Sequence, residues 1–128
     1  MAEEQITITL DDLINSLNSL NNTVINIPDM VENPYVIMPQ VLSDQQYYFE
    51  FHWSIRQQRC FLSLYKIKDD ERIYYVKNKA LLNQMDVSKY ITATDWTGNL
   101  WFESINDNEL LDYTQKDIGN NFVLKYVA

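Results

Sequence analysis

The chain has few of the residues that build covalent or metal-held sites. Among 128 residues there is one cysteine, Cys60, and one histidine, His52. A single cysteine excludes an internal disulfide, and one Cys with one His gives too few soft ligands for a zinc-type site. A thiol nucleophile would need His52 as its base. We therefore expect no metal, no cofactor and no catalytic residue in this chain.

Glycine is also scarce, with only Gly98 and Gly119 in the sequence. A glycine-rich loop that cradles phosphate is excluded on this count. The turns must instead use Asn and Asp, which tolerate left-handed backbone. Pairs of these residues stand at 21–22, 69–70 and 120–121, where we expect turns.

Long apolar runs are absent. No stretch of about 18 apolar residues occurs, so we expect no membrane-spanning helix. The first residues are acidic and have no apolar core, so we expect no secretory signal. At 46% hydrophobic residues, the composition is typical of one folded domain with its own core and not of a disordered chain.

Positive charge is missing from the first part of the chain. Residues 1–55 hold eight acids and no Lys or Arg, residues 56–79 hold seven bases and three acids, and residues 80–128 hold seven acids and three bases. The net charge of −8 is opposite to what a nucleic-acid binder needs. Either the segments of opposite sign neutralise one another within the fold, or they form a two-signed surface that orients the protein in an assembly.

The most informative feature present is a run of alternating aromatic and polar residues. Tyr47, Phe49, Phe51 and Trp53 share one face of a predicted strand over residues 46–54. Further strands are predicted over 60–67, 72–77, 100–105 and 122–127, with turns near 56–58 and 69–71. The predicted fold is mainly β: a small antiparallel barrel or sandwich.

The part before this meander has a different character. Residues 10–20 place apolar side chains at helical spacing, which predicts a short N-terminal amphipathic helix. Three prolines follow within residues 23–42, and proline disfavours a long regular element, so the short strand-like pieces at 24–27 and 35–38 are edge strands or an extended arm. We predict an acidic N-terminal extension over residues 1–42, with the helix and the Pro-containing arm, and an antiparallel β domain over 43–128.

Six residues are candidates for an interface with other chains. The helical stripe, the first turn of the meander and one tryptophan supply them: Leu13, Ile14, Leu17, Arg56, Arg59 and Trp96. Bases in a turn are often merely solvated, and the alternative is a salt bridge to the acidic N-terminal segment of a neighbouring chain. Trp53 and Trp101 are expected in the core, whereas Trp96 fits the core and an interface equally.

The order of these features resembles the baseplate plug family of contractile-tailed bacteriophages and phage-tail-like particles. The resemblance covers residues 45–127. It rests on the segments Phe49-Glu50-Phe51-His52-Trp53, Arg56 and Arg59, Phe61-Leu62-Ser63-Leu64-Tyr65, Ile73-Tyr74-Tyr75-Val76, Leu81-Leu82, Gly98-Asn99-Leu100-Trp101-Phe102, Asp117-Ile118-Gly119 and Leu124-Lys125-Tyr126-Val127. The chain departs from the family in the turn after Tyr65, where Asp-Asp-Glu stands in place of a glycine, and in its longer N-terminal part.

The resemblance implies a structural virion protein and no enzyme. Such a protein would be made in the host cytoplasm and would sit in the tail baseplate, near the tube, hub and spike proteins. The net charge argues against a nucleic-acid partner and the lack of long apolar runs against a membrane, and a homo-oligomer within the assembly stays open. The rival interpretation is a carbohydrate- or protein-binding β module, which the nine tyrosines and three tryptophans would serve.

Overall fold

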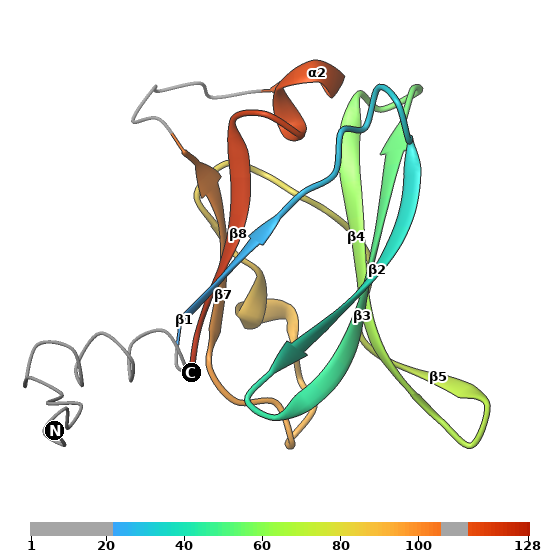
Figure 1. The fold of residues 1–128 in the computed structure, drawn as a ribbon, viewed down its shortest axis with the longest axis vertical. Coiled ribbons are helices and arrows are strands. Elements are labelled where there is room, and N and C mark those ends of the chain that lie inside the picture. Colours follow the sequence, from blue (N-terminus) through green and yellow to red (C-terminus); the bar gives the residue numbers. More distant parts are fainter. Residues whose placement is uncertain (1–21, 106–112) are drawn as a thin grey trace, which may run out of the picture.

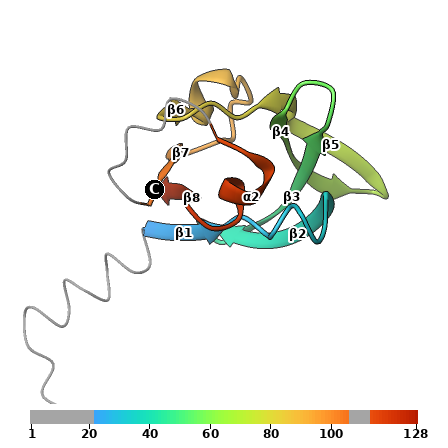
Figure 2. The same ribbon diagram turned by 90° about the horizontal axis from the view of Figure 1, so that it is seen from above.

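Two four-stranded antiparallel sheets face each other in the computed structural model, which describes residues 22–105 and 113–128 (Figures 1 and 2). The first, here the terminal sheet, has the order β1 (Asn22–Asn26), β8 (Phe122–Val127), β7 (Asn99–Ser104) and β6 (Met85–Asp86). The second, the meander sheet, has the order β2 (Tyr35–Leu42), β3 (Gln45–Ser54), β4 (Arg59–Lys68) and β5 (Glu71–Ala80). A 3-10 helix, η2 (Val87–Tyr90), and a short helix, α2 (Gln115–Ile118), complete the described part. The predicted mainly β sandwich is confirmed.

The alternation in β3 positions the core. Tyr47, Phe49, Phe51 and Trp53 are all buried, because successive side chains of a strand point to opposite faces and these four share the inward one. They meet a cluster from the terminal sheet in which Phe102 stacks on Phe122, with ring centroids 5.1 Å apart.

The prediction for Trp101 is wrong, because this side chain is 40% exposed. Its neighbours Leu100 and Phe102 are both fully buried. The period of two therefore turns Trp101 to the outer side of β7.

Two tight hairpins do without glycine. Ser43 and Asp44 have φ angles of 50° and 63°, and Asp69 and Asp70 have φ angles of 54° and 65°. Both pairs link adjacent antiparallel strands through two residues, the connection that needs positive φ at both positions. Three aspartates and one serine thus supply the left-handed backbone, in place of the scarce glycine.

The predicted strand-like pieces at 24–27 and 35–38 lie mostly in edge strands. β1 pairs with β8, and β2 pairs with β3 along its whole length, so they are not a free arm. The division of the chain at residue 43 stays a prediction, although β1 and β2 are hydrogen-bonded to strands that follow it. The predicted helix over residues 10–20 lies outside the described residues.

Tyr113 ties the two sheets together. Its hydroxyl donates to the Leu81 carbonyl oxygen at 2.5 Å and accepts from the Cys60 backbone N–H at 3.0 Å. Its ring packs edge-on against Phe102, with centroids 5.7 Å apart. One side chain beside α2 therefore satisfies two backbone groups at the end of the meander sheet while it contributes to the core between the sheets.

Candidate interaction surface

The side of the meander sheet that looks away from the core carries the candidate site. Because the inward residues of β3 are odd-numbered, its even-numbered residues and their partners in the strand register point outward. We call this surface the outer face. It comprises Tyr35, Ile37, Pro39 and Val41 of β2, Tyr48, Glu50 and His52 of β3, Phe61, Ser63 and Tyr65 of β4, and Arg72, Tyr74 and Asn78 of β5.

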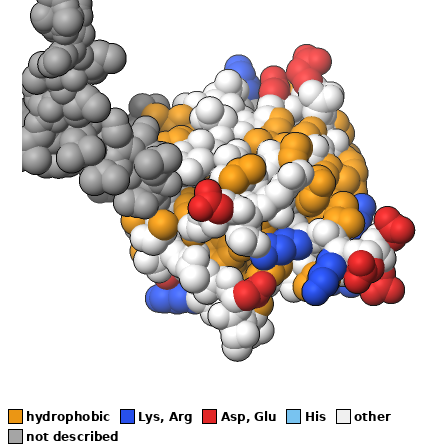
Figure 3. Space-filling view, turned by 60° about the horizontal axis from the view of Figure 1, so that its bottom comes forward, with side chains coloured by type: hydrophobic (Ala, Val, Ile, Leu, Met, Phe, Trp, Pro, Cys, Tyr) orange, Lys and Arg blue, Asp and Glu red, His pale blue; other side chains and the backbone are white. Residues whose placement is uncertain are grey.

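The β2 edge of the outer face is an apolar ridge, formed by Tyr35, Ile37, Pro39 and Val41. Tyr35, Ile37 and Val41 are 52%, 39% and 56% exposed, and Pro39 between them is exposed too. Figure 3 shows hydrophobic side chains gathered on the surface beside charged ones. Contiguous apolar groups at a protein surface are typical of an interaction site.

Pro39 interrupts the outward backbone groups of this edge. The Trp53 N–H donates to the Pro34 carbonyl oxygen at 2.8 Å, which fixes the alternation of the β2–β3 ladder. The backbone groups of the ridge residues then point away from β3. Pro39 has no N–H to offer there, and proline on an edge strand blocks pairing with another strand. Pro39 therefore removes one donor from the outward backbone groups of this edge, which makes the edge a poorer template for another strand.

A stack of tyrosines forms the centre of the outer face. Tyr65 is 1% exposed although it points outward, because Tyr48 stacks on it with centroids 5.6 Å apart and Tyr74 lies at 5.4 Å. The guanidinium carbon of Arg72 lies 4.5 Å from the same ring. This burial raises the pKa of Tyr65.

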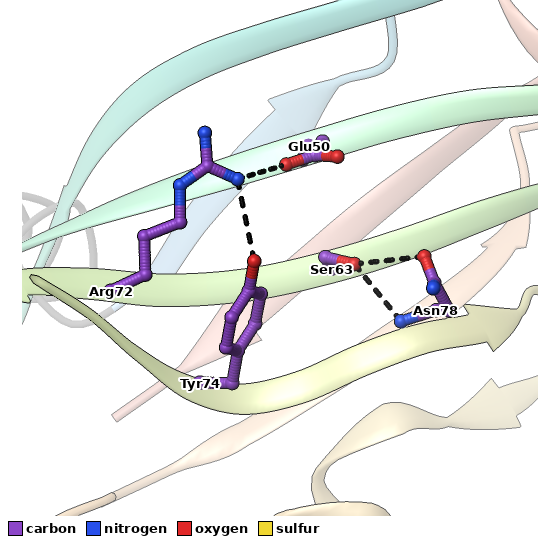
Figure 4. Close-up of polar contacts among 5 residues, drawn as sticks. All are labelled: Glu50, Ser63, Arg72, Tyr74 and Asn78. Carbon is purple, nitrogen blue, oxygen red and sulfur yellow. Dashed lines mark hydrogen bonds and ion pairs between the residues drawn. The ribbon is translucent and has the colours of Figure 1, made fainter.

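Polar contacts hold these groups in place across three strands (Figure 4). Arg72 Nη1 donates to Glu50 Oε1 at 3.0 Å and to the Tyr74 hydroxyl oxygen at 3.3 Å. The contact with Tyr74 is the main cause that raises the pKa of Arg72. Interaction with the Glu50 carboxylate is the main cause that raises the pKa of Tyr35. Glu50 therefore holds Arg72 against the tyrosine stack.

A β-bulge shapes the far side of the outer face. The register between β4 and β5 shifts around Leu64, and the Ser63 Oγ accepts from the Asn78 N–H at 2.9 Å and contacts Asn78 Oδ1 at 3.4 Å (Figure 4). Asn78 itself has a φ of 49°. Beside it lies a shallow pocket of about 310 Å³, lined by His52, Ser54, Gln57, Phe61 and Asn78.

A second pocket, of about 400 Å³, lies between the β4–β5 hairpin and the loop before β7. Lys66, Tyr75 and Asp95 are among the residues that line it. The Tyr75 hydroxyl donates to Asp95 Oδ2 at 2.6 Å, and Lys66 Nζ lies 3.5 Å from the same oxygen. The bond from Tyr75 is the main cause that lowers the pKa of Asp95. These contacts join the loop before β7 to the meander sheet.

The structure does not gather the sequence-predicted interface residues into one site. Arg56 is exposed in the turn after β3, and the guanidinium carbon of Arg59 lies 5.8 Å from the Tyr113 ring. Trp96 is at the other end of β3, half-buried against Tyr47 at 5.4 Å. Leu13, Ile14 and Leu17 lie outside the described residues. The outer face was not predicted from the sequence, although its β3 residues are the even-numbered ones that alternate with the buried residues.

Cys60 and His52 do not form a reactive pair. Cys60 is fully buried, and burial raises the pKa of its thiol to about 12. Its register partner is the inward Trp53, whereas His52 is exposed on the outer face. Within residues 22–105 and 113–128, no three acidic, His or Cys side chains are close enough together to hold a metal ion. No helix in these ranges is both long and apolar enough to span a membrane.

A family model matches most of the chain. The family model described as "Cyanophage baseplate Pam3 plug gp18" matches residues 24–128, from within β1 to the last residue. No curated protein matches the chain. The match includes β2 and its ridge, so it begins earlier than the resemblance over residues 45–127 and leaves residues 1–23 outside it.

Proposed function

The chain belongs to the family of the cyanophage Pam3 baseplate plug gp18, and from this premise we propose that it acts in a contractile tail, in contact with tube, hub and spike proteins. Members of this family are structural proteins of the phage virion and are located in the tail baseplate. The finer proposal is a plug that fills the centre of the baseplate and stabilises it before contraction.

The outer face is the observation that carries this proposal. It is a broad surface with an exposed apolar ridge and a pre-ordered tyrosine stack, and such a surface gains free energy when another protein covers it. Arg72 and Glu50 are held in place before any partner arrives, so little side-chain freedom would be lost on binding. The proposed mechanism is passive burial of complementary surfaces, without catalysis.

The remaining candidate residues have separate proposed roles. Arg56 is exposed at the turn of the β3–β4 hairpin, where it can meet an acidic neighbour. Arg59 would support this turn through its contact with Tyr113. Trp96 donates from Nε1 to the Gly98 carbonyl oxygen at 3.1 Å, so it shapes the loop that it would present to a partner.

Cryo-electron microscopy of tails tests the proposal. Tails purified from a phage that lacks this chain, and tails complemented with it, should differ by density at the centre of the baseplate. A chain altered by Ile37→Asp and Val41→Asp should enter the tails poorly, whereas the control Leu82→Asp, at a side chain 51% exposed outside the outer face, should enter normally. If purified phage particles that lack this chain were infectious and their tails showed unchanged density at the centre of the baseplate, the placement would be refuted.

A carbohydrate-binding module is the second candidate, and the pocket at the end of the outer face is what favours it. The pocket combines the Phe61 ring with the amide groups of Gln57 and Asn78, and rings beside amides suit the apolar and hydroxyl faces of a sugar. A glycan array tests this candidate. Specific binding that is lost on Phe61→Ala would support it, and an array without signal would exclude it.

A further inference from the structure

The meander sheet has two edge strands, β2 and β5, and they differ in what they offer to another strand. β2 carries Pro39, whereas β5 holds 10 residues without proline or glycine. The β4–β5 hairpin also projects beyond the rest of the described fold (Figures 1 and 2). Its turn at residues 69–70 and the first part of β5, from Glu71 to Tyr74, are exposed. An exposed edge strand without proline is a template for pairing with another chain.

The turn of this hairpin fixes which backbone groups of β5 are free. It has two residues, 69–70, both with positive φ, and Lys68 pairs with Glu71. The flanking pair of such a hairpin is hydrogen-bonded in both directions, and bonded and non-bonded pairs alternate from there. The N–H and C=O groups of Arg72 and Tyr74 therefore point away from β4. Among the strands that the structure describes, only β4 pairs with β5.

A second copy of β5 fits these free groups. When two such strands lie antiparallel about a twofold axis, Arg72 of each copy can oppose Tyr74 of the other, and both residues exchange their N–H and C=O bonds. Ile73, which is 44% exposed, then meets its own copy on the axis. Any other register would place these groups opposite the turn or opposite the register shift that follows Tyr74, where the backbone is less suited to pairing.

The charges along the hairpin suit this orientation. Asp69, Asp70 and Glu71 lie at one end of β5, and Lys77 and Lys79 lie toward the other. The ion pairs among the described residues include none of these five side chains. Antiparallel pairing reverses one copy, so the acidic end of each strand lies beside the basic end of the other. Opposite charges on neighbouring strands stabilise their pairing.

We propose that this chain forms a symmetric dimer in which the β5 strands of two copies pair antiparallel through Arg72 and Tyr74. The two meander sheets then continue as one sheet. The same strand serves as the interface in both copies, so association stops at the dimer. This inference goes beyond the proposed function, which needs no second copy.

Sedimentation velocity of the full-length chain tests the dimer. The wild type should pass from monomer to dimer with rising concentration, and more weakly in high salt because part of the attraction is between charges. Asp69→Asn with Asp70→Asn keeps residues that tolerate left-handed backbone and should weaken the dimer about fivefold. Asp44→Asn, in the other two-residue turn, should leave it unchanged. A wild type that stays monomeric at about 1 mM, or that grows beyond a dimer, would overturn the inference.

Proline at position 74 tests the backbone bonds. Tyr74→Pro removes an N–H that points away from β4, so the hairpin should keep its own ladder. The dimer should weaken about tenfold or more relative to Tyr74→Ala. Tyr74→Ala is the matched control, because it loses the same ring but keeps the N–H. Equal dimerisation of the two variants would show that β5 does not pair through its backbone.

A cysteine at position 73 locates the twofold axis. Directly opposed residues of a non-bonded pair have Cα atoms about 4.5 Å apart, which a disulfide can span, so Ile73→Cys should give a covalent dimer under mild oxidation. Ile67→Cys is the control, since Ile67 is 51% exposed but lies on β4, separated from its copy by both β5 strands. The native Cys60 is buried in both variants.

Equal cross-linking of the two cysteine variants, or none in either, would contradict the proposed register. The cysteine readout also decides the matter if circular dichroism shows that Tyr74→Pro is unfolded. A chain that fails these tests but still enters purified tails would leave the proposed function standing.

Discussion

Replacing Tyr113 by Phe isolates the hydroxyl that joins the two sheets. The ring would keep its contacts with Phe102 and Phe122, so the change removes one oxygen and little packing. Two buried backbone groups would lose that partner, the Cys60 N–H and the Leu81 carbonyl. A buried polar group left unsatisfied costs about 1–3 kcal/mol. The Leu81 carbonyl has a second lone pair and loses less, so we expect a total of about 2–4 kcal/mol.

Equilibrium unfolding in urea measures this loss, because the midpoint falls with the free energy of unfolding while the slope stays constant. Tyr90→Phe is the matched control, since Tyr90 is 51% exposed and loses no buried partner. It should change stability by less than about 0.5 kcal/mol. If Tyr113→Phe were as mild as this control, the hydroxyl would not be a structural link between the sheets, and the account of this part of the fold would be wrong.

Three further predictions concern the thiol, a turn and a helix cap. Burial raises the pKa of Cys60 to about 12 from an ordinary value of about 9. The stability linked to this thiol is therefore complete below about pH 9 and is lost as the pH rises toward 12. Near about pH 8, a thiol reagent should modify Cys60 no faster than the chain unfolds. Gly98→Ala should destabilise the chain by about 2 kcal/mol or more, since Gly98 has a φ of 96° and a Cβ there would lie 2.6 Å from the Val127 carbonyl oxygen; a thermal melt unchanged by the substitution would contradict the strain. The backbone N–H of Thr114 is the main cause that lowers the pKa of Asp117, which closes a capping box on α2, so Asp117 stabilises the fold above its ordinary pKa and this stability is lost as the pH falls through the lowered value. Asp117→Ala should remove about 1 kcal/mol near neutral pH and flatten the acid limb of a pH–stability curve, whereas an unchanged limb would count against the cap.

The parts of the fold that follow a local period could be read from the sequence. The alternation of β3 predicted which side chains are buried, and the bounds of β8 agree with the predicted strand over residues 122–127. The same rule would have placed Trp101 outside, because Leu100 and Phe102 flank it. The size of an aromatic side chain favours burial, but at this position the alternation of the strand decides.

The candidate site depended on long-range register, which one sequence does not reveal. Tyr65 is buried on an outward face because Tyr48 and Tyr74 arrive opposite it from neighbouring strands. Arg72 reaches Glu50 across a third strand. The bulge that brings Asn78 to Ser63 leaves no simple mark in the spacing of apolar residues. Tertiary pairing, and not propensity, created this surface.

Pro39 affects how easily free molecules would pair through β2 before they assemble. Before assembly, a protein with an exposed apolar edge strand is in solution with identical copies of itself. Such strands can pair between molecules and grow into fibrils. Because Pro39 has no backbone N–H, β2 is a poor template for pairing with another strand. The apolar side chains of Ile37 and Val41 beside it stay exposed and can still contact a partner. Pro39 thus weakens backbone pairing between identical molecules at this edge and leaves the apolar side chains beside it available for contact.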